Sequence, residues 1–302
     1  MVTGKLLDIP VVDAHFHLWD RAANPYPWLA EDSPRPTLGD HRPLMRSFGL
    51  SDHRREIGRF LDVAGGIHVE AGCADPVAET RWIADVASSA GMPLAHVARV
   101  DLIDEQAPKR IAELSDEPIV RGIRMRLNAD PKIAGRAGIA DEPLFRRNFR
   151  AVADSGLVFE LSIFPSQSEE GGRLAADFPQ TCFVLNHLGW PRIVEGLDDF
   201  DTWRRAMARL ARHSNIAVKL SMLWPIDRGW RRNIVEPFIA ETVDLFGTDR
   251  VLFGSNYPIE AVIGETEHQL STVIDCLRDL TKPELEAVFR LNAARIFDLS
   301  LS

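Results

Sequence analysis

Short apolar runs alternate with longer amphipathic stretches along the whole chain. Eight runs have the length and the β-branched or aromatic content of buried strands. They span residues 9–18, 65–72, 93–102, 119–127, 156–164, 181–189, 215–223 and 250–258. Amphipathic stretches that predict helices lie at 78–91, 141–155, 199–213, 230–246, 264–279 and 284–297. Because no Gly-, Pro- or Ser-rich linker divides these units, they predict one domain over residues 1–302, a (β/α)8 TIM barrel. A doubly wound open sheet is the competing topology.

Two of the predicted helices carry end signals. The 78–91 stretch has an apolar stripe with Trp82 and Val86, and it ends at Gly91, a typical C-cap residue. Thr281 and Glu284 have the capping-box spacing in front of the last apolar stretch. We expect that last stretch to be the closing helix of the barrel.

Residues 21–60 interrupt the alternation, because a loop between a strand and its helix normally needs only about 2–6 residues. This segment contains NPYPWL and SPRP. Its Tyr26, Trp28 and Leu29 are too apolar for a solvated linker. We therefore expect a long insertion after the first strand that forms a lid or wall over the barrel mouth, with peripheral packing as the alternative.

Composition excludes several classes of protein. The chain has 302 residues, 45% of them hydrophobic, and a formal net charge of −9, so a disordered chain is excluded and a nucleic-acid partner is not expected. No signal peptide or membrane-spanning run is visible, which predicts a cytoplasmic protein without a membrane partner. Cys73, Cys182 and Cys276 are far apart, as expected for reduced thiols. The expected partner is a small-molecule substrate, and a homo-oligomer is compatible with the sequence.

The first strand carries the clearest candidate chemistry, since catalytic groups of such a barrel lie at the C-terminal ends of strands. It ends in DAHFH, and alternation predicts that Asp13, His15 and His17 share one face. Two buried imidazoles at the open end each need a partner, which a metal ion or a substrate carbonyl can supply. Solvent-facing histidines are the alternative interpretation of this motif alone.

Polar residues occupy comparable places on other strands. His187 ends the sixth run and Asn256 the eighth, while His68 and Glu70 share a face of the second. Arg124, on the fourth, is expected to face the same cavity, where a guanidinium suits a bidentate grip on a substrate carboxylate. Together these strand ends predict an active site.

Aromatic residues follow several of the strands. Tyr26, Trp28 and Trp190 fall in the proposed loops after the first and sixth strands. Their faces are expected to pack against the ring or C–H surface of a substrate, with ordinary packing in the rim as the alternative.

Seven motifs distributed along the chain resemble those of a known family. They are VVDAHFH, HVEAG, RGIRMRL, NHLGWP, VKLS, LFGSNYP and NAARIF. Together they resemble the amidohydrolase-2 (amidohydrolase-related) branch of the amidohydrolase superfamily, which includes sugar lactonases and pyrone-dicarboxylate lactonase. The resemblance covers essentially the whole chain. It implies a (β/α)8 hydrolase that acts on the ester bond of a lactone, derived from a sugar acid or from aromatic degradation.

The chain also departs from that family's pattern. Metal sites of the superfamily typically add a Lys or Glu on strand four, His on strands five and six, and an Asp on strand eight. Here strand four has arginines, strand five offers Glu160 and Ser162, and Asn256 stands in place of the Asp. A two-metal site is therefore not expected. Asn256 can orient water or substrate, but its amide is not a base near neutral pH.

Two mechanisms and two other functions stay open. In one mechanism His15 and His17, with His187 or Glu70 nearby, hold a single zinc or manganese ion that activates water. In the other, which the missing Asp and Lys favour, no metal is needed: histidines and Arg124 polarise the lactone carbonyl and a His or Glu is the base. The other functions are a metal-dependent decarboxylase of an aromatic or unsaturated acid, and a ligand-binding barrel without catalysis.

Overall fold

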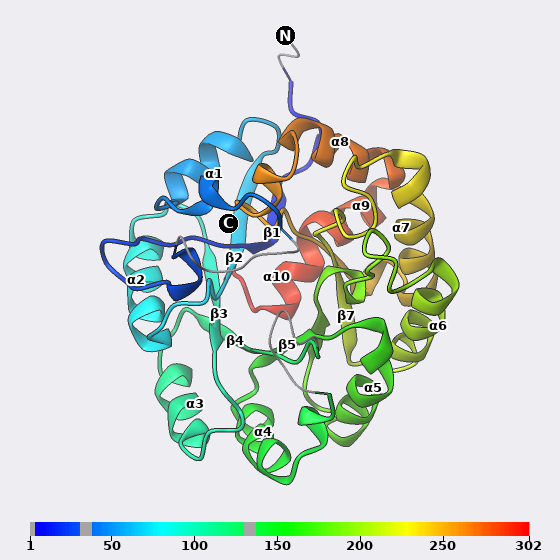
Figure 1. Cartoon of the computed structure of the whole chain (residues 1–302). Helices are drawn as coiled ribbons and strands as arrows, with labels where there is room; N and C mark the ends of the chain where they lie inside the picture. Colours follow the sequence, from blue (N-terminus) through cyan, green and yellow to red (C-terminus); the bar gives the residue numbers. More distant parts are fainter. Residues whose placement is uncertain (1–3, 31–37, 130–136, 302) are drawn as a thin grey trace.

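Eight parallel strands form one sheet in chain order from β1 to β8 in the computed structural model, which describes residues 4–30, 38–129 and 137–301. The strands are β1 Val11–Phe16, β2 Val63–Val69, β3 Leu94–Arg99, β4 Val120–Arg126, β5 Val158–Ser162, β6 Phe183–Leu185, β7 Ile216–Leu220 and β8 Val251–Phe253. Each overlaps one of the predicted runs, because the apolar, β-branched content of these runs suits strands buried on both faces. The predicted (β/α)8 barrel is confirmed, and Figure 1 shows it with the strands inside and the helices around them.

Helices follow the strands and cover the barrel. They are α1 Leu50–Glu56, α2 Pro76–Ser88, α3 Ala107–Ser115, α4 Pro143–Ser155, α5 Ser168–Asp177, α6 Phe200–Ala211, α7 Arg232–Phe246, α8 Thr266–Cys276, α9 Lys282–Glu286 and α10 Asn292–Ile296. The sequence patterns predicted α2, α4, α6, α7, α8 and the last helical stretch, but did not single out α1, α3 and α5.

The last helical stretch closes the end of the barrel where the strands begin. A π-helical turn, Ala287–Leu291, joins α9 to α10, and the predicted capping box is present, with Glu284 accepting from the backbone N–H of Thr281 at 2.7 Å. Ala293 and Phe297 pack with Val12 and other small side chains of the barrel interior. Figure 1 shows α10 lying across the ring of strands.

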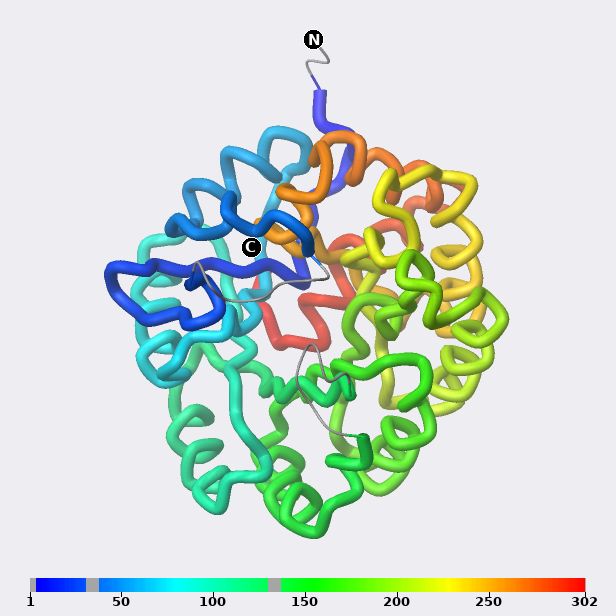
Figure 2. The backbone as a smooth tube through the Cα atoms, in the orientation of Figure 1, coloured from blue at the N-terminus to red at the C-terminus, as the bar shows by residue number. Residues whose placement is uncertain are grey.

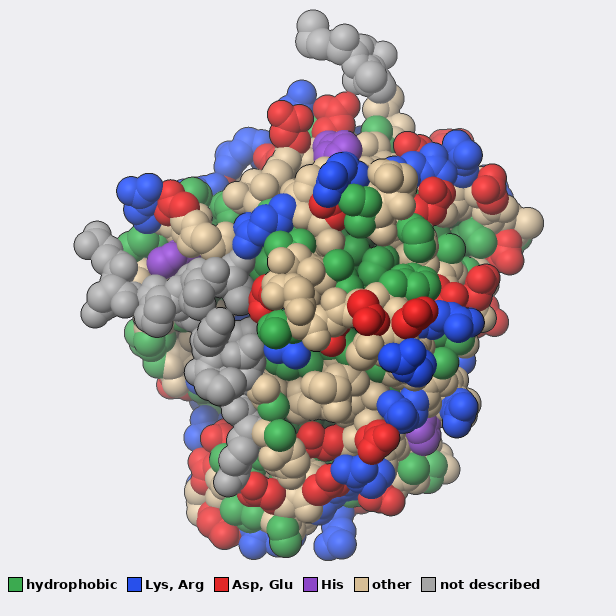
Figure 3. Space-filling view, turned by 45° about the vertical axis from the view of Figure 1, so that its right-hand side comes forward, with side chains coloured by type: hydrophobic (Ala, Val, Ile, Leu, Met, Phe, Trp, Pro, Cys, Tyr) green, Lys and Arg blue, Asp and Glu red, His purple; other side chains and the backbone are tan. Residues whose placement is uncertain are grey.

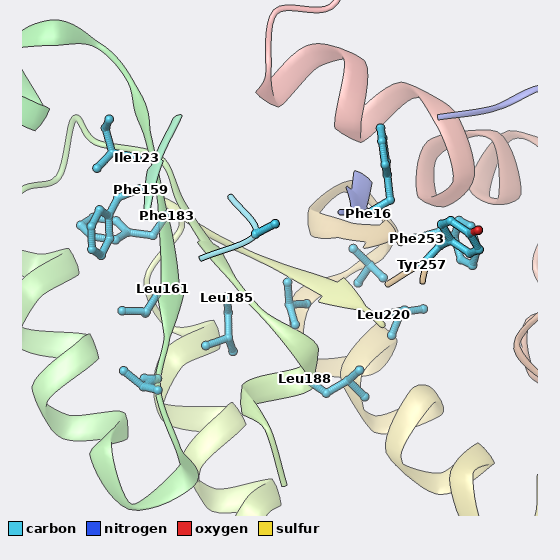
Figure 4. Packing of buried hydrophobic residues seen from close by; sticks show 14 of the residues in the cluster. Phe16, Ile123, Phe159, Leu161, Phe183, Leu185, Leu188, Leu220, Phe253 and Tyr257 are labelled. Carbon is cyan, nitrogen blue, oxygen red and sulfur yellow. The ribbon is translucent and has the colours of Figure 1, made fainter. Parts of the chain in front are cut away.

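A second apolar layer lies between the strands and the helices. Figure 4 shows Ile123, Phe159, Leu161 and Phe183 on the outer face of their strands. Alternation thus assigns the other positions to the interior, where Val158 packs low in the barrel. Side chains at the upper interior positions are mostly polar, and these build the site described below.

β1 contains a bulge that corrects one prediction. Asp13 pairs with Gly66 of β2 but Phe16 pairs with His68, so β1 has one residue more than β2 over this interval. The extra residue breaks the alternation: His15 points into the barrel, whereas Asp13 points outward. The prediction that Asp13 shares a face with His15 and His17 is therefore wrong.

Asp13 instead joins three parts of the fold. Its carboxylate accepts from the backbone N–H of Ser255 at 2.8 Å, after β8, and lies 2.8 Å from Nε2 of His53 in α1. Next to it, a Cβ built on Gly254 would lie 2.6 Å from Cβ of His15, so only glycine permits this approach. Asp13 thereby fastens β8 and α1 to β1 where the barrel closes.

The insertion after β1 runs outward past β2 and α2, as the dark blue tube in Figure 2 shows. It contains two 3-10 turns, Pro27–Leu29 and Arg42–Leu44, as well as α1; its SPRP motif lies outside the described residues. On the face shown in Figure 3, acidic and basic side chains are interspersed. Within the described ranges no helix has the length and apolarity to cross a membrane.

Candidate active site

A cavity of about 1280 Å³ opens at the C-terminal ends of the strands, the end where barrels of this type carry their active sites. Pro27 and Trp28 of the insertion contribute to its wall. Predicted site residues that line it are His17, Glu70, Arg124, His187, Trp190 and Asn256. Residues from five strand ends and from the insertion therefore meet around one space.

His17 lines this cavity and His15 lies against it, with the two rings nearly perpendicular. Their Nε2 atoms are 3.2 Å apart, and Nδ1 of His17 is 2.8 Å from the carbonyl oxygen of Val69. Because a carbonyl only accepts, Nδ1 of His17 carries the hydrogen and its Nε2 is an acceptor. Burial lowers the pKa of His17 to about 3 and that of His15 well below its usual value, so both rings are neutral near pH 7.

Lys219 and Glu160 lie below this pair, inside the barrel. They form a fully buried ion pair, and Nζ of Lys219 is 3.2 Å from Nδ1 of His15. Sequence reasoning missed Lys219. Its signal was a charged residue inside an apolar strand, at an interior position two residues after Ala217.

His187 stands beside the pair, at the end of β6. Its ring centroid is 4.6 Å from that of His15, and its Nδ1 is 2.8 Å from Oγ of Ser221. Because Nδ1 is bonded, Nε2 is the nitrogen available to the cavity that the ring lines. Burial lowers the pKa of His187 well below its usual value, so the imidazole is neutral and able to accept a proton.

Arg124 is turned toward Glu70. Its Nε donates to Oε1 of Glu70 at 2.8 Å, and its Nη2 donates to the Glu70 carbonyl at 2.8 Å and to the carboxylate. Burial alone would raise the pKa of Glu70, but the charges of Arg124 and Arg126 outweigh it and lower this pKa to about 2. Glu70 is thus ionised. It binds the edge of the Arg124 guanidinium that we had expected, from the sequence, to bind a substrate carboxylate.

Asn256, after β8, is oriented by a buried acid. Its Nδ2 donates to Oε2 of Glu260 at 3.3 Å, and its backbone N–H donates to the carbonyl of His15 at 2.7 Å. Burial raises the pKa of Glu260 to about 8. Because Nδ2 donates to Glu260, Asn256 can present its Oδ1 as an acceptor to the cavity.

Two predicted substrate-binding residues are not brought to the cavity. His68 points from β2 toward the helices, because Ile67 and Val69 take the interior positions; its Nδ1 is 2.9 Å from Nδ1 of His96. Tyr26 is buried in the outer core. Neither is among the described residues that line the cavity, whereas Trp28 and Trp190 both are.

The histidine pair has the spacing of two metal ligands but not their hydrogen-bonding pattern. The 3.2 Å between the Nε2 atoms of His15 and His17 is the spacing of two ligands that each lie about 2.0–2.1 Å from one zinc ion. However, Lys219 places a hydrogen-bond donor on the far side of His15, and no third His, Cys, Asp or Glu in the described ranges completes a metal site with the pair. The donor set therefore does not fit a resident metal ion.

The chain is similar in sequence to a known family and to several known proteins. A model of the amidohydrolase family matches residues 12–299. An uncharacterized protein of Sinorhizobium fredii is 29% identical over 296 residues, covering 96% of this chain and 99% of that protein. An L-fucono-1,5-lactonase of Burkholderia ambifaria is 31% identical over 255 residues, covering 84% of this chain and 82% of that protein.

Solved structures agree with this placement. A zinc-bound amidohydrolase from Burkholderia multivorans is 25% identical, with a TM-score of 0.80 over 97% of this chain and 100% of that one. Two more distant structures share the fold at 15% identity. They are a probable 2-pyrone-4,6-dicarboxylic acid hydrolase from Acinetobacter baumannii (TM-score 0.72, 96% and 100% covered) and a manganese-bound 5-carboxyvanillate decarboxylase from Novosphingobium aromaticivorans (TM-score 0.62, 97% and 97% covered). Because the family model spans nearly the whole chain, the protein belongs to the amidohydrolase family.

Proposed function

We propose that this protein is a lactonase that hydrolyses an uncharged polyhydroxy lactone, the cyclic ester of a sugar acid. The observation that carries the proposal is the set of buried hydrogen-bonding groups on the cavity wall: two neutral imidazoles, an amide, and a guanidinium paired with Glu70. The relative from Burkholderia ambifaria, named L-fucono-1,5-lactonase, supports the same reaction class.

The Arg124–Glu70 pair argues for an uncharged substrate. An anionic lactone would need a positive charge to offset the loss of its hydration. Since Arg124 already donates to a carboxylate with two of its nitrogens, this buried guanidinium is engaged before any substrate arrives. Sugar hydroxyls instead need donors and acceptors without net charge, which the His187, Asn256 and Trp190 side chains can offer.

The reaction can proceed through the chain's own groups. Nε2 of His187 accepts a proton from a water molecule that Asn256 orients, while the water oxygen adds to the lactone carbonyl carbon. N–H donors around the cavity stabilise the negative charge that develops on the carbonyl oxygen. The ring C–O bond then breaks, and the proton on His187 passes to the departing ring oxygen. The product is an open-chain hydroxy acid.

A panel of lactones tests this proposal. Protein freed of metal by a chelator is mixed with neutral 1,4- and 1,5-lactones of sugar acids and, separately, with 2-pyrone-4,6-dicarboxylate, and acid release is followed with a pH indicator. We expect turnover of at least one neutral lactone and little with the dicarboxylate. Preference for the dicarboxylate would contradict the proposed substrate class. Carbon dioxide release from an aromatic acid, without lactone hydrolysis, would support the decarboxylase instead.

A further inference from the structure

The buried Lys219 has no place in the mechanism above, although it touches the histidine pair. We propose that Lys219 is a positioning residue that fixes the tautomers of His15 and His17, so that the pair does not capture a divalent metal ion. The inference starts from the contact between Nζ of Lys219 and Nδ1 of His15, 3.2 Å apart in a fully buried site.

Lys219 donates a hydrogen bond to His15 whether the proton that it can share with Glu160 lies on the lysine or on the acid. As an ammonium group, Nζ has only donors. As a neutral amine beside a protonated Glu160, its single lone pair accepts from that acid, and its remaining N–H groups still donate. The third arrangement, an amine that accepts from His15 beside an ionised Glu160, would bury an uncompensated carboxylate at high cost. Nδ1 of His15 is therefore the acceptor.

This assignment sets the direction of the whole chain of hydrogen bonds. A neutral imidazole with an acceptor at Nδ1 carries its hydrogen on Nε2. His15 then donates from Nε2 to Nε2 of His17, 3.2 Å away, and His17 donates from Nδ1 to Val69. The chain runs from Lys219 to the Val69 carbonyl with every donor matched to an acceptor.

These tautomers determine whether the histidine pair can bind a metal ion. A metal ion needs the lone pairs of both Nε2 atoms, but the Nε2 of His15 holds a hydrogen as long as Lys219 donates to Nδ1. Neither the tautomers nor the metal exclusion depends on the proposed function.

Ring ¹⁵N spectra of histidine-labelled protein test the tautomers directly. In the wild type we expect His15 protonated at Nε2 and His17 at Nδ1, with His15 assigned by comparison with His15→Gln. Lys219→Met should abolish the preference of His15 for protonation at Nε2. Lys219→Arg, which keeps a hydrogen-bond donor, should retain this preference. Lys109→Met, at an exposed lysine of α3, is the matched control and should change neither ring. A wild-type His15 protonated at Nδ1 would overturn the proposal.

Calorimetric titration with chelator-buffered zinc ions tests the exclusion. Lys219→Met should bind zinc at least tenfold more tightly than the wild type and Lys109→Met. Equal affinities in all three would refute the exclusion. Should Lys219→Met not fold, the wild-type spectrum and Lys219→Arg still decide the tautomers. A wild type with the expected tautomers but no lactone turnover would contradict the proposed function and leave this inference standing.

Discussion

Each functional side chain is held by a partner that determines its chemical role. His187 is held by Ser221, Asn256 by Glu260, and Arg124 by Glu70. At these strand ends the sequence indicated which residue types are present, but their partners decide whether a group accepts, donates or carries net charge. Predictions about single residues therefore concern these pairs.

His187→Ala should lower turnover at least a hundredfold and leave the fold intact, because it removes the proposed base. General acid–base groups typically contribute about 10²–10⁴-fold. Lactone hydrolysis and circular dichroism would be measured together, with the exposed His268→Ala as control. A near-normal rate for His187→Ala would remove this residue from the reaction.

Glu70→Gln should shift specificity toward anionic lactones, since it leaves the charge of Arg124 unbalanced in the cavity. We expect the ratio of kcat/KM for a carboxylate-bearing lactone to that for a neutral lactone to rise about tenfold, the size of one charge-assisted hydrogen bond. Asp104→Asn, at the outer rim of the same cavity, is the matched control. An unchanged ratio would show that Glu70 does not set the charge preference.

At the scale of elements, the join between β8 and β1 combines a short backbone contact with the side chain of Asp13. No ladder of strand pairs links these two strands in the described residues. They are connected by a single bridge, Phe16 with Tyr257, by two backbone hydrogen bonds beside it, and by the Asp13 carboxylate. The bulge that turns Asp13 outward also turns His15 inward. One irregularity thus serves both the closure of the barrel and the site.

Asp13→Asn should destabilise the fold by about 3 kcal/mol, because an amide cannot accept at both positions from Ser255 and His53. Urea unfolding gives the free energy, and hydrogen exchange should quicken first in β1 and after β8. Asp40→Asn, which alters an exposed pair with Arg42, should leave stability unchanged. If both variants unfold at the same urea concentration, the carboxylate does not fasten this join.

At the scale of the whole molecule, buried histidines make stability depend on pH. Burial lowers the pKa of His17 to about 3 and that of His96 to about 4, and it holds those of His15, His68 and His187 well below the usual value. Each takes up a proton on unfolding below pH 6.5. In the opposite sense, burial raises the pKa values of Glu79 and Glu260 to about 8, so these acids release protons on unfolding near neutral pH.

Stability should therefore be greatest near pH 7 and fall on both sides. Near pH 5.5, unfolding lets the five histidines take up protons and the two acids release theirs, which is a net uptake of about three protons. The free energy of unfolding therefore rises by about 4 kcal/mol per pH unit in this range. Above pH 7 the two acids dominate and stability declines more gently. Urea unfolding from pH 5 to 8.5 measures the curve, and His96→Gln should remove about one proton from the acidic slope. A flat curve between pH 5 and 6.5 would contradict neutral buried histidines.

The comparisons confirm the predicted family and the class of enzyme, a hydrolase that acts on ester bonds. A structural neighbour contains zinc, whereas the donor set of this chain does not fit a resident metal ion. The roles of His15, His17, His187 and Asn256 stay proposals, which the experiments above address.

The sequence by itself determined the eight strands, the helix of most units, the insertion and the family, because periodicity and motifs are local properties of the chain. It also determined that polar residues end several strands. Only the tertiary structure decided that Asp13 and His68 face the helices, that Glu70 balances Arg124, and that Lys219 contacts His15. These contacts join residues 40 to 204 positions apart. A local pattern cannot encode them, since they depend on a bulge and on how neighbouring strands align across the barrel.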